Sequence, residues 1–444
     1  MTERLPIPAL GRPRPLRLPA VADGTLPNGL RVLIARRPGI PRFECRLVVP
    51  MSASRDQRDS ARFRLLTETV LSGTPSRSSR DIAETLQAMG AALGTYADTE
   101  QLIVGGSSLS SRRRPFLDLF GEVLADAAFP ADEVSIERDR VVQEIALQRS
   151  QPGTIAADAL ARRMYGSHPY GWGTPDAEAV ASVGAATLRR LHHQRVLPGG
   201  SVLVLVGDLD PDKTVADVEA AFAAWPTGAA RRHPVPPTVE LPPPLLLVDR
   251  PGSVQTTVRF AGPGLPRTDP GYPALSLAVM VYGGYFVSRL NDNIRERKGY
   301  TYGAYSRIEQ RKAAAQVTIA TDVGREVTAP ALVEIEHELG RMVTTPIEQA
   351  ELESARRYVQ GSLAMGTQTQ AGLTAYLATV VSSGLPVTYL RDYPKALEQV
   401  TVADVQASAR RFLGPHRLAR VLVGDAETVE PAIAPLYAVE HPGA

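Results

Sequence analysis

The sequence predicts an α+β fold made of two homologous domains, each with helices packed on a mainly antiparallel β-sheet. Three observations support this prediction. The chain repeats itself at an offset of about half its length, a proline-rich segment separates the repeats, and each repeat mixes strand patterns with amphipathic helices. At 444 residues the chain is also too long for one ordinary core, so at least two domains are expected.

The internal repeat is visible at both ends of each unit. Residues 35–50 (ARRPGIPRFECRLVVP) correspond to residues 248–263 (VDRPGSVQTTVRFAGP), with Arg-Pro-Gly in register at an offset of about 213 residues. Residues 201–208 (SVLVLVGD) correspond to residues 420–425 (RVLVGD) at an offset of about 217 residues. Because the two offsets are nearly equal, two units of similar length follow each other in the same order.

The domain division follows from the prolines. Residues 226–244 (PTGAARRHPVPPTVELPPP) separate the units, and proline fixes φ and removes backbone donors, so we expect a stiff, extended linker there. The predicted division is therefore a proline-rich N-terminal arm at 1–24, a first domain at 25–225, the linker at 226–244 and a second domain at 245–444.

Each unit is expected to open with a strand, continue with amphipathic helices and close with an apolar strand ending in Val-Gly-Asp. Typical opening strands are Leu30–Ala35 and Val258–Ala261. A helix is also expected from about Ser288 to Lys298, stopped by Gly299 and followed by a strand from Tyr300. The other expected helices are Arg80–Met89, Glu133–Arg149, Ala177–His192, Val327–Met342, Ile347–Leu363 and Val402–Phe412, the last of which matches Ala185–His192.

The composition excludes several classes of protein. A formal net charge of only +2 gives no support to a nucleic-acid partner. A single cysteine, Cys45, excludes an internal disulfide and a cysteine-cluster metal site, and its apolar neighbours predict a buried side chain. The N-terminus has no secretory apolar core, and the longest apolar stretch, near Leu275–Val287, is too short to span a bilayer. We therefore expect no membrane association and a cytoplasmic location.

Residues 283–305 read GGYFVSRLNDNIRERKGYTYGAY, and this segment resembles the second domain of the pitrilysin/insulinase-type (M16) metallopeptidases. In that family an arginine and a tyrosine seven positions later face the active site, and Arg295 and Tyr302 have this spacing. Residues 346–413 and the segment LPNGLRVLIARR (26–37) also resemble the family, so the likeness covers nearly the whole chain after about residue 25.

The resemblance implies a role for the Arg295/Tyr302 pair. A guanidinium and a phenol can donate hydrogen bonds to the carbonyls of a bound peptide and to the oxyanion that develops during hydrolysis. The alternative is that the sequence RERK is a solvated last helical turn, whose cations suit the negative end of the helix dipole.

The zinc signature of the family is missing. Its members carry His-x-x-Glu-His on a helix, in which two imidazoles bind zinc and the glutamate polarises the attacking water. The matching stretch is FRLLTETVLSGT (63–74), where Arg64, Thr67 and Glu68 occupy those three positions. The third family ligand, a downstream glutamate, aligns with Glu144. We expect no metal here, and we expect Glu68 and Glu144 to form local salt bridges with neighbours such as Arg64.

A second implied feature is an edge strand. Residues 89–109 (MGAALGTYADTEQLIVGGSSL) match the region where, in the family, an extended peptide pairs with the sheet through backbone hydrogen bonds. The alternative is an ordinary strand.

The resemblance therefore implies half of a clam-like shell and a non-catalytic subunit of a heterodimeric peptidase. The expected partners are a homologous zinc-bearing M16 subunit and a peptide substrate, and the zinc cofactor is expected in the partner and not in this chain. Two alternatives stay open. One is a non-enzymatic structural homologue, and the other is a peptide-binding homodimer that does not hydrolyse its ligand.

Overall fold

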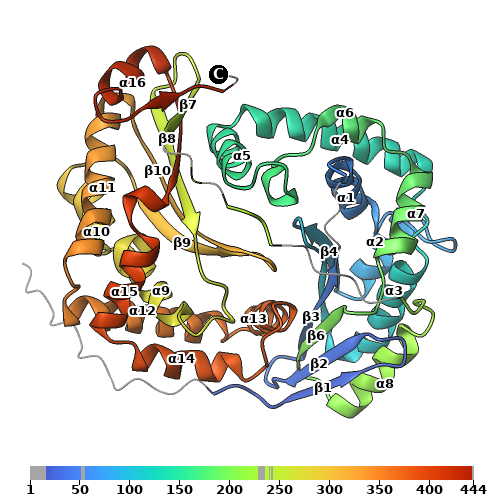
Figure 1. The fold of residues 1–444 in the computed structure, drawn as a ribbon. Helices are drawn as coiled ribbons and strands as arrows, with labels where there is room; N and C mark the ends of the chain where they lie inside the picture. The colour runs from blue at the N-terminus through green and yellow to red at the C-terminus, as the bar shows by residue number, and fades with distance from the viewer. Residues whose placement is uncertain (1–16, 52–55, 229–235, 240, 242–243, 443–444) are drawn as a thin grey trace, which may run out of the picture.

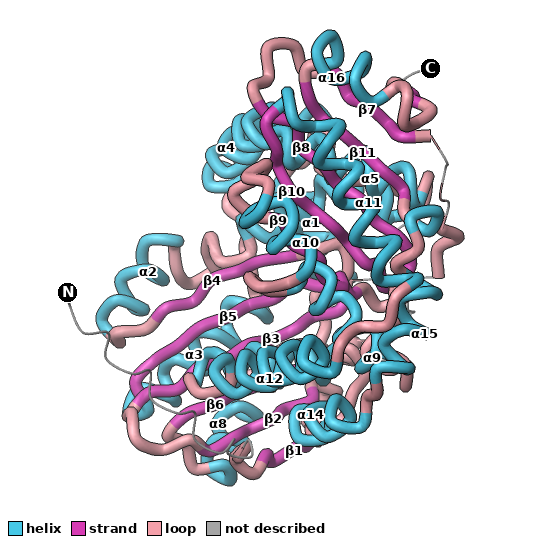
Figure 2. Tube along the Cα trace, turned by 90° about the vertical axis from the view of Figure 1, so that its left-hand side faces the viewer, coloured by secondary structure: helices cyan, strands magenta, loops and turns pink. Residues whose placement is uncertain are grey.

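The computed structural model of the chain describes residues 17–51, 56–228, 236–239, 241 and 244–442, and these residues form two six-stranded sheets with their helices (Figure 1). The two sheets lie one above the other in Figure 2. Most of the predicted N-terminal arm (1–16) and much of the predicted linker (229–235, 240 and 242–243) lie outside the described residues. Within the described part, no helix is long and apolar enough to cross a bilayer.

The first sheet has the strand order β1-β2-β6-β3-β5-β4. Strand β6 runs parallel to β2 and antiparallel to β3, and the other pairs are antiparallel. Its first strand begins inside the segment predicted as an arm. The strands are β1 (Val21–Thr25), β2 (Arg31–Arg36), β3 (Arg42–Pro50), β4 (Ala92–Ala97), β5 (Gln101–Leu109) and β6 (Val202–Gly207).

The second sheet has the order β12-β7-β11-β8-β10-β9 and repeats this topology in all but its edge strand β12, which is parallel to β7, whereas β1 is antiparallel to β2. Strand β11 is parallel to β7 and antiparallel to β8, so β7 to β11 correspond one by one to β2 to β6. The predicted fold class, two homologous α+β units with mainly antiparallel sheets, is confirmed. The strands are β7 (Leu245–Asp249), β8 (Gln255–Pro263), β9 (Ala304–Gln310), β10 (Ala315–Gly324), β11 (Ala419–Gly424) and β12 (Val439–Glu440).

The helices pack around the two sheets (Figure 1). Those of the first half are α1 (Arg58–Thr69), α2 (Ser79–Ala88), α3 (Arg113–Ala125), α4 (Ala131–Ser150), α5 (Pro152–Tyr165), α6 (Ala177–Ala181), α7 (Ala185–Arg195) and α8 (Pro211–Ala221). Those of the second half are α9 (Tyr272–Val279), α10 (Arg289–Asn291), α11 (Thr328–Thr344), α12 (Gln349–Gly366), α13 (Gln370–Ser382), α14 (Tyr389–Gln399), α15 (Val402–Phe412) and α16 (Ala426–Ile433).

Two predicted elements differ from the structure. The helix expected over Ala177–His192 is two helices, because the chain turns between α6 and α7 to bury Val183, and Gly184 is extended at the start of α7 (φ −113°, ψ 166°). The strand expected from Tyr300 begins only at Ala304. Before it, the Thr301 hydroxyl donates to the carbonyl of Asp322 (2.8 Å) and holds a turn in place of a sheet ladder.

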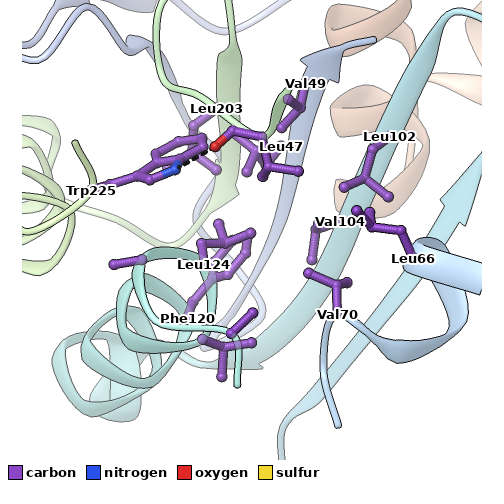
Figure 3. Close-up of a cluster of buried hydrophobic side chains, with 14 of the residues drawn as sticks. Leu47, Val49, Leu66, Val70, Leu102, Val104, Phe120, Leu124, Leu203 and Trp225 are labelled. Carbon is purple, nitrogen blue, oxygen red and sulfur yellow. Dashed lines mark hydrogen bonds between the residues drawn. The ribbon is translucent and has the colours of Figure 1, made fainter. Parts of the chain in front are cut away.

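The core of the first half lies between its sheet and helices α1 and α3, as Figure 3 shows for Leu47, Leu66 and Phe120. The indole of Trp225 is fully buried there, and its Nε1 donates to the carbonyl of Val196 (3.1 Å). Each fully buried leucine or phenylalanine side chain of this core contributes roughly 1.5–3 kcal/mol to the stability of the fold by leaving water. Cys45 is buried in the same core, as predicted, and burial raises the pKa of its thiol.

Each sheet also has a face that is covered by a helix from the other half. Strand β6 is buried on both faces, and its Val202, Val204 and Val206 contact α13 through Leu373 and Leu377. A continuous apolar run such as VLVLVG is typical of a strand that is buried on both faces. The second half therefore supplies the cover of the first sheet (Figure 1).

The reverse contact is made by α5, which packs against β8 and β11 and lies beside β11 in Figure 2. Its Leu160 and Met164 pack against Ala419, Val421 and Val423 of the second sheet. The two halves thus exchange one helix each, and each half needs the helix of the other to cover the second face of its sheet.

The hairpin turns of the two sheets also meet. The carboxylate of Glu100, between β4 and β5, accepts the Lys312 N–H (2.8 Å) from the turn between β9 and β10, and it accepts the Tyr170 hydroxyl. The Tyr170 oxygen in turn accepts the Ala313 N–H (3.2 Å), and the Arg311 guanidinium lies 4.8 Å from the Tyr170 ring centroid. Glu100 is buried, so these bonds satisfy a group that would otherwise be costly to bury.

The helix exchange predicts that damage to α13 destabilises the sheet of the other half. Leu377→Ala should cost about 2–5 kcal/mol, the usual range for truncating a buried leucine. Hydrogen exchange should become faster in β6 as well as in α13, measured by mass spectrometry. The control Leu147→Ala removes an exposed side chain (63%) and should change stability by less than about 0.5 kcal/mol. Faster exchange confined to α13 would contradict the account.

Candidate functional site

Arg295 and Tyr302 line one cavity of about 400 Å³ at the edge of the second sheet. Arg295 lies on a π-helical segment, Asp292–Arg297, that continues α10, and this segment ends where Gly299 adopts a left-handed conformation (φ +65°). Tyr302 lies in the turn that leads into β9. The rest of the cavity is lined by Gly283, Gly284, Tyr285, Phe286, Asn291, Gly303, Ala304 and Tyr305.

A buried asparagine fixes the two sides of this cavity to each other. The Asn291 Nδ2 donates to the Ala304 carbonyl (2.7 Å), and the Asn291 Oδ1 accepts the Ala304 N–H (2.9 Å). The same Nδ2 lies 3.2 Å from the carbonyl of Tyr285 in the glycine-rich turn. One side chain therefore ties the helix that carries Arg295 to the first residue of β9 and to the turn at Gly283–Gly284.

Two further interactions hold the backbone around this cavity, which we call the frame. The Arg289 guanidinium makes two hydrogen bonds to the Glu351 carboxylate (2.6 and 2.7 Å), and such paired bonds are among the strongest in proteins. The Thr321 hydroxyl donates to the Gly303 carbonyl (3.1 Å), just beyond Tyr302. The backbone on both sides of Tyr302 is therefore held, while its side chain is 93% exposed.

The charged end of Arg295 lies among aromatic rings. Its Cζ lies 4.0 Å from the ring centroid of Phe286 and 5.6 Å from that of Tyr302. Its nearest carboxylate is that of Glu296, at 3.2 Å, and the Glu296 side chain is half exposed, so this pair contributes little. The guanidinium and the phenol thus present hydrogen-bond donors to the same cavity.

The four positions that align with the zinc site lie elsewhere, on α1 and α4. The Arg64 guanidinium lies 2.6 Å from the Glu144 carboxylate and 3.2 Å from the Glu68 carboxylate. Arg140, which sequence reasoning missed, reaches the same two carboxylates at 3.4 and 2.7 Å. The Thr67 hydroxyl turns back to donate to the carbonyl of Phe63 (2.8 Å). Glu68 and Glu144 are therefore bridged by two guanidinium groups.

These residues do not fit zinc. Structural and catalytic zinc sites use neutral imidazole, thiolate or free carboxylate ligands, whereas both carboxylates here are already neutralised by arginines. A guanidinium at the place of a divalent cation also repels it. Among the described residues, no group of three histidine, cysteine, aspartate or glutamate side chains is arranged to hold a metal. The histidine His192 belongs to the core: its ring packs on Phe129, and burial, with the neighbouring His193, lowers its pKa to about 4.

A second cavity, of about 210 Å³, lies beside the α1–α4 cluster. Its walls include Phe63, Arg64 and Thr67 of α1, together with Ala97 at the end of strand β4. Trp172 closes another side, and nothing in the sequence pattern pointed to it. Among the described strands β4 pairs with β5 alone, so the segment 89–109, matched to an edge-strand region, contains the edge strand β4 and the interior strand β5. The Arg295/Tyr302 pair lines a different cavity, so this chain does not join the two sets of residues in one site.

Two family models match consecutive parts of the chain: insulinase (peptidase family M16) over residues 32–176, and the peptidase M16 inactive domain over residues 182–359. A relative from Mycobacterium tuberculosis (strain ATCC 25618 / H37Rv), described as an uncharacterized zinc protease, is 28% identical over 411 residues, which cover 90% of this chain and 92% of the relative. A relative from Bacillus subtilis (strain 168), described as the uncharacterized zinc protease YmxG, is 23% identical over 349 residues, which cover 78% of this chain and 84% of the relative.

Two solved structures have the same fold over most of the chain. A crystal structure described as a peptidase M16 inactive domain from Pseudomonas fluorescens gives a TM-score of 0.85 with 27% identity, covering 91% of this chain and 98% of that one. A protease from Helicobacter pylori gives a TM-score of 0.84 with 17% identity, covering 92% and 100%, which supports the fold alone. The sequence motifs, the two repeated sheets and these matches agree, and the chain belongs to the M16 (insulinase) peptidase family.

Proposed function

We propose that this chain is the non-catalytic subunit of a two-chain M16 zinc metallopeptidase, forming half of a clam-like shell in the cytoplasm. The partner is a homologous subunit with an intact His-x-x-Glu-His helix, which supplies the zinc and cleaves the peptide. This chain binds and orients the peptide through Arg295 and Tyr302, and it needs no cofactor of its own.

One observation carries the proposal: an exposed phenol and a guanidinium share a cavity on a rigidly held turn, in a chain whose zinc-site positions are filled by ion pairs. A family member without metal ligands has no obvious need for such donors in its own chemistry. A site completed by two subunits would use them. The exposure of Tyr302 (93%) leaves its hydroxyl free to meet a ligand from outside the chain.

The two donors differ in what they offer to a bound peptide. The Tyr302 hydroxyl is neutral and donates one hydrogen bond, which is worth most where negative charge develops on a carbonyl oxygen. The Arg295 guanidinium is charged and donates along its edge, so it strengthens binding of the ground state as well. Because the frame at Asn291 and Arg289 holds both donors in place, little reorganisation is needed when a peptide arrives.

A second candidate function is a structural or peptide-binding homologue without hydrolysis. The observation that favours it is local: Arg295 already contacts Glu296 and two aromatic rings, so the pair is partly satisfied without a ligand. The two functions differ in whether Arg295 and Tyr302 affect turnover in a complex with a zinc-bearing homologue.

The first prediction of this proposal concerns metal. The purified chain should hold no stoichiometric zinc, measured by elemental analysis after dialysis. The triple variant Arg64→His, Thr67→Glu, Glu68→His supplies two imidazoles beside Glu144 and should gain zinc affinity. Adding Arg140→Leu should tighten binding further, because Arg140 lies 3.4 Å from Glu144 and competes with the metal.

The matched control adds Glu144→Gln to the triple variant and should abolish the gain in calorimetric titrations. One tightly bound zinc per wild-type chain would sink the assignment of this subunit as non-catalytic.

The second prediction concerns turnover of the reconstituted pair. Tyr302→Phe removes a single donor and should lower kcat by roughly 10²–10³, or about 2.7–4 kcal/mol, if the phenol serves the developing oxyanion. Arg295→Ala should raise KM as well as lower kcat. Steady-state assays on a peptide substrate would measure both effects.

Matched controls for these variants are Tyr376→Phe and Arg297→Ala. Tyr376 is a partly exposed tyrosine on α13, and Arg297 is an exposed arginine two residues after Arg295. Both controls should keep wild-type kinetics. If Tyr302→Phe and Arg295→Ala also stay within about twofold of wild type, the pair is a solvated helix end and the chain is a scaffold.

A further inference from the structure

The side chain of Phe286 occupies an unusual place for a large apolar residue. It is 61% exposed, and the adjacent Val287 is 66% exposed, so neither belongs to a core. The Phe286 ring is nevertheless the aromatic ring closest to the Arg295 guanidinium, with the Cζ 4.0 Å from the ring centroid, against 5.6 Å for Tyr302. At this distance a guanidinium over an aromatic face is attracted by the negative charge density of the ring.

The backbone that carries Phe286 is held on both sides. The carbonyl of Tyr285 accepts hydrogen bonds from the Ser288 N–H (3.1 Å) and the Asn291 Nδ2 (3.2 Å), and the Tyr285 ring lies 5.2 Å from that of Tyr358. Gly283 packs so closely on Ser306 that an added Cβ would lie 3.0 Å from its Oγ. The backbone from which the Phe286 ring projects is therefore a constrained turn.

Arg295 needs such a partner because little else fixes its end. An arginine side chain has several rotatable bonds and loses considerable freedom when its head group is held. The contact with Glu296 joins neighbouring residues at a half-exposed position and is weak in water. A ring on the face of the guanidinium restrains it and leaves its N–H edge open for a ligand carbonyl.

We infer that Phe286 is a positioning residue for Arg295. Its ring holds the guanidinium face, so that the N–H edge points into the cavity shared with Tyr302. The consequence for turnover rests on the proposed function, whereas the ordering of Arg295 is a property of this chain alone. The two statements can therefore be tested separately.

The ordering is tested on the isolated full chain by NMR relaxation of the Arg295 Nε–H group, identified by its loss in Arg295→Lys. Phe286→Leu removes the ring but keeps an apolar side chain, and it should lower the order parameter of this group toward that of a free side chain. Phe286→Tyr restores a ring and should restore the order. The control Val287→Ala removes an equally exposed neighbour and should leave the order unchanged. Equal order in wild type and Phe286→Leu would overturn the inference.

The consequence is tested by kinetics of the reconstituted pair. Phe286→Leu should lower kcat/KM about two- to fivefold, the size expected for an exposed cation–π contact, and Phe286→Tyr should recover it. In an Arg295→Ala background the same change should have no further effect, because the two residues act as a unit. A full additional loss in that background would contradict the inference. If Arg295 loses order in Phe286→Leu but even Arg295→Ala leaves turnover unchanged, the positioning stands and the proposed function fails.

Discussion

The exchange of one helix between the two halves is the interaction on which the rest of the structure depends. Strand β6 is apolar on both faces, and Ala419, Val421 and Val423 give β11 an apolar face away from its own core, so each strand needs a cover on that side. Helix α13 covers β6 and helix α5 covers β11, which joins the two sheets into one body. Roughly 1.5–3 kcal/mol for each buried side chain makes this contact a large part of the stability of both halves.

This exchange determines which surfaces are left for function. Helices occupy the faces of the central strands, and the two sheets end at the edge strands β1 and β4 in the first and β12 and β9 in the second. Each candidate cavity lies at one of these edges. The cavity at β4 is bordered by the α1–α4 ion pairs, and the cavity at β9 contains Arg295 and Tyr302.

Much of the fold could be predicted from the sequence because the repeat states it twice. The nearly equal offsets of Arg-Pro-Gly and Val-Gly-Asp predicted two units of the same topology, each closed by an apolar strand, and β6 and β11 are those strands. The identity of the covering helix could not be predicted, because an amphipathic pattern does not say which sheet it meets. Hydrogen bonds from side chains to the backbone could not be predicted either. The Thr301 hydroxyl bonds the carbonyl of Asp322, and β9 begins only at Ala304; the hydrophobic periodicity of the sequence contains no sign of such a bond.

The candidate site was predictable to the same degree. The resemblance identified Arg295 and Tyr302, and the loss of imidazoles was plain from Arg64 and Glu68. Two residues that hold these groups were missed. Asn291 bonds Ala304 beside the Arg295/Tyr302 cavity, and Arg140 bonds Glu68, and both contacts join residues that are separated in the sequence. Phe286 was missed for another reason: an apolar residue in a glycine-rich turn gives no sign that it lies against a cation.

The most direct test of the central claim is complementation by mixing. A homologous chain with an intact His-x-x-Glu-His helix from the same source would be held at a fixed micromolar concentration while this chain is added, and peptide cleavage and particle mass would be followed together. The account predicts negligible cleavage by either chain alone and a rise in activity that saturates at a one-to-one ratio, where a heterodimer appears. Full activity of the zinc-bearing chain alone, with no mixed species, would contradict it.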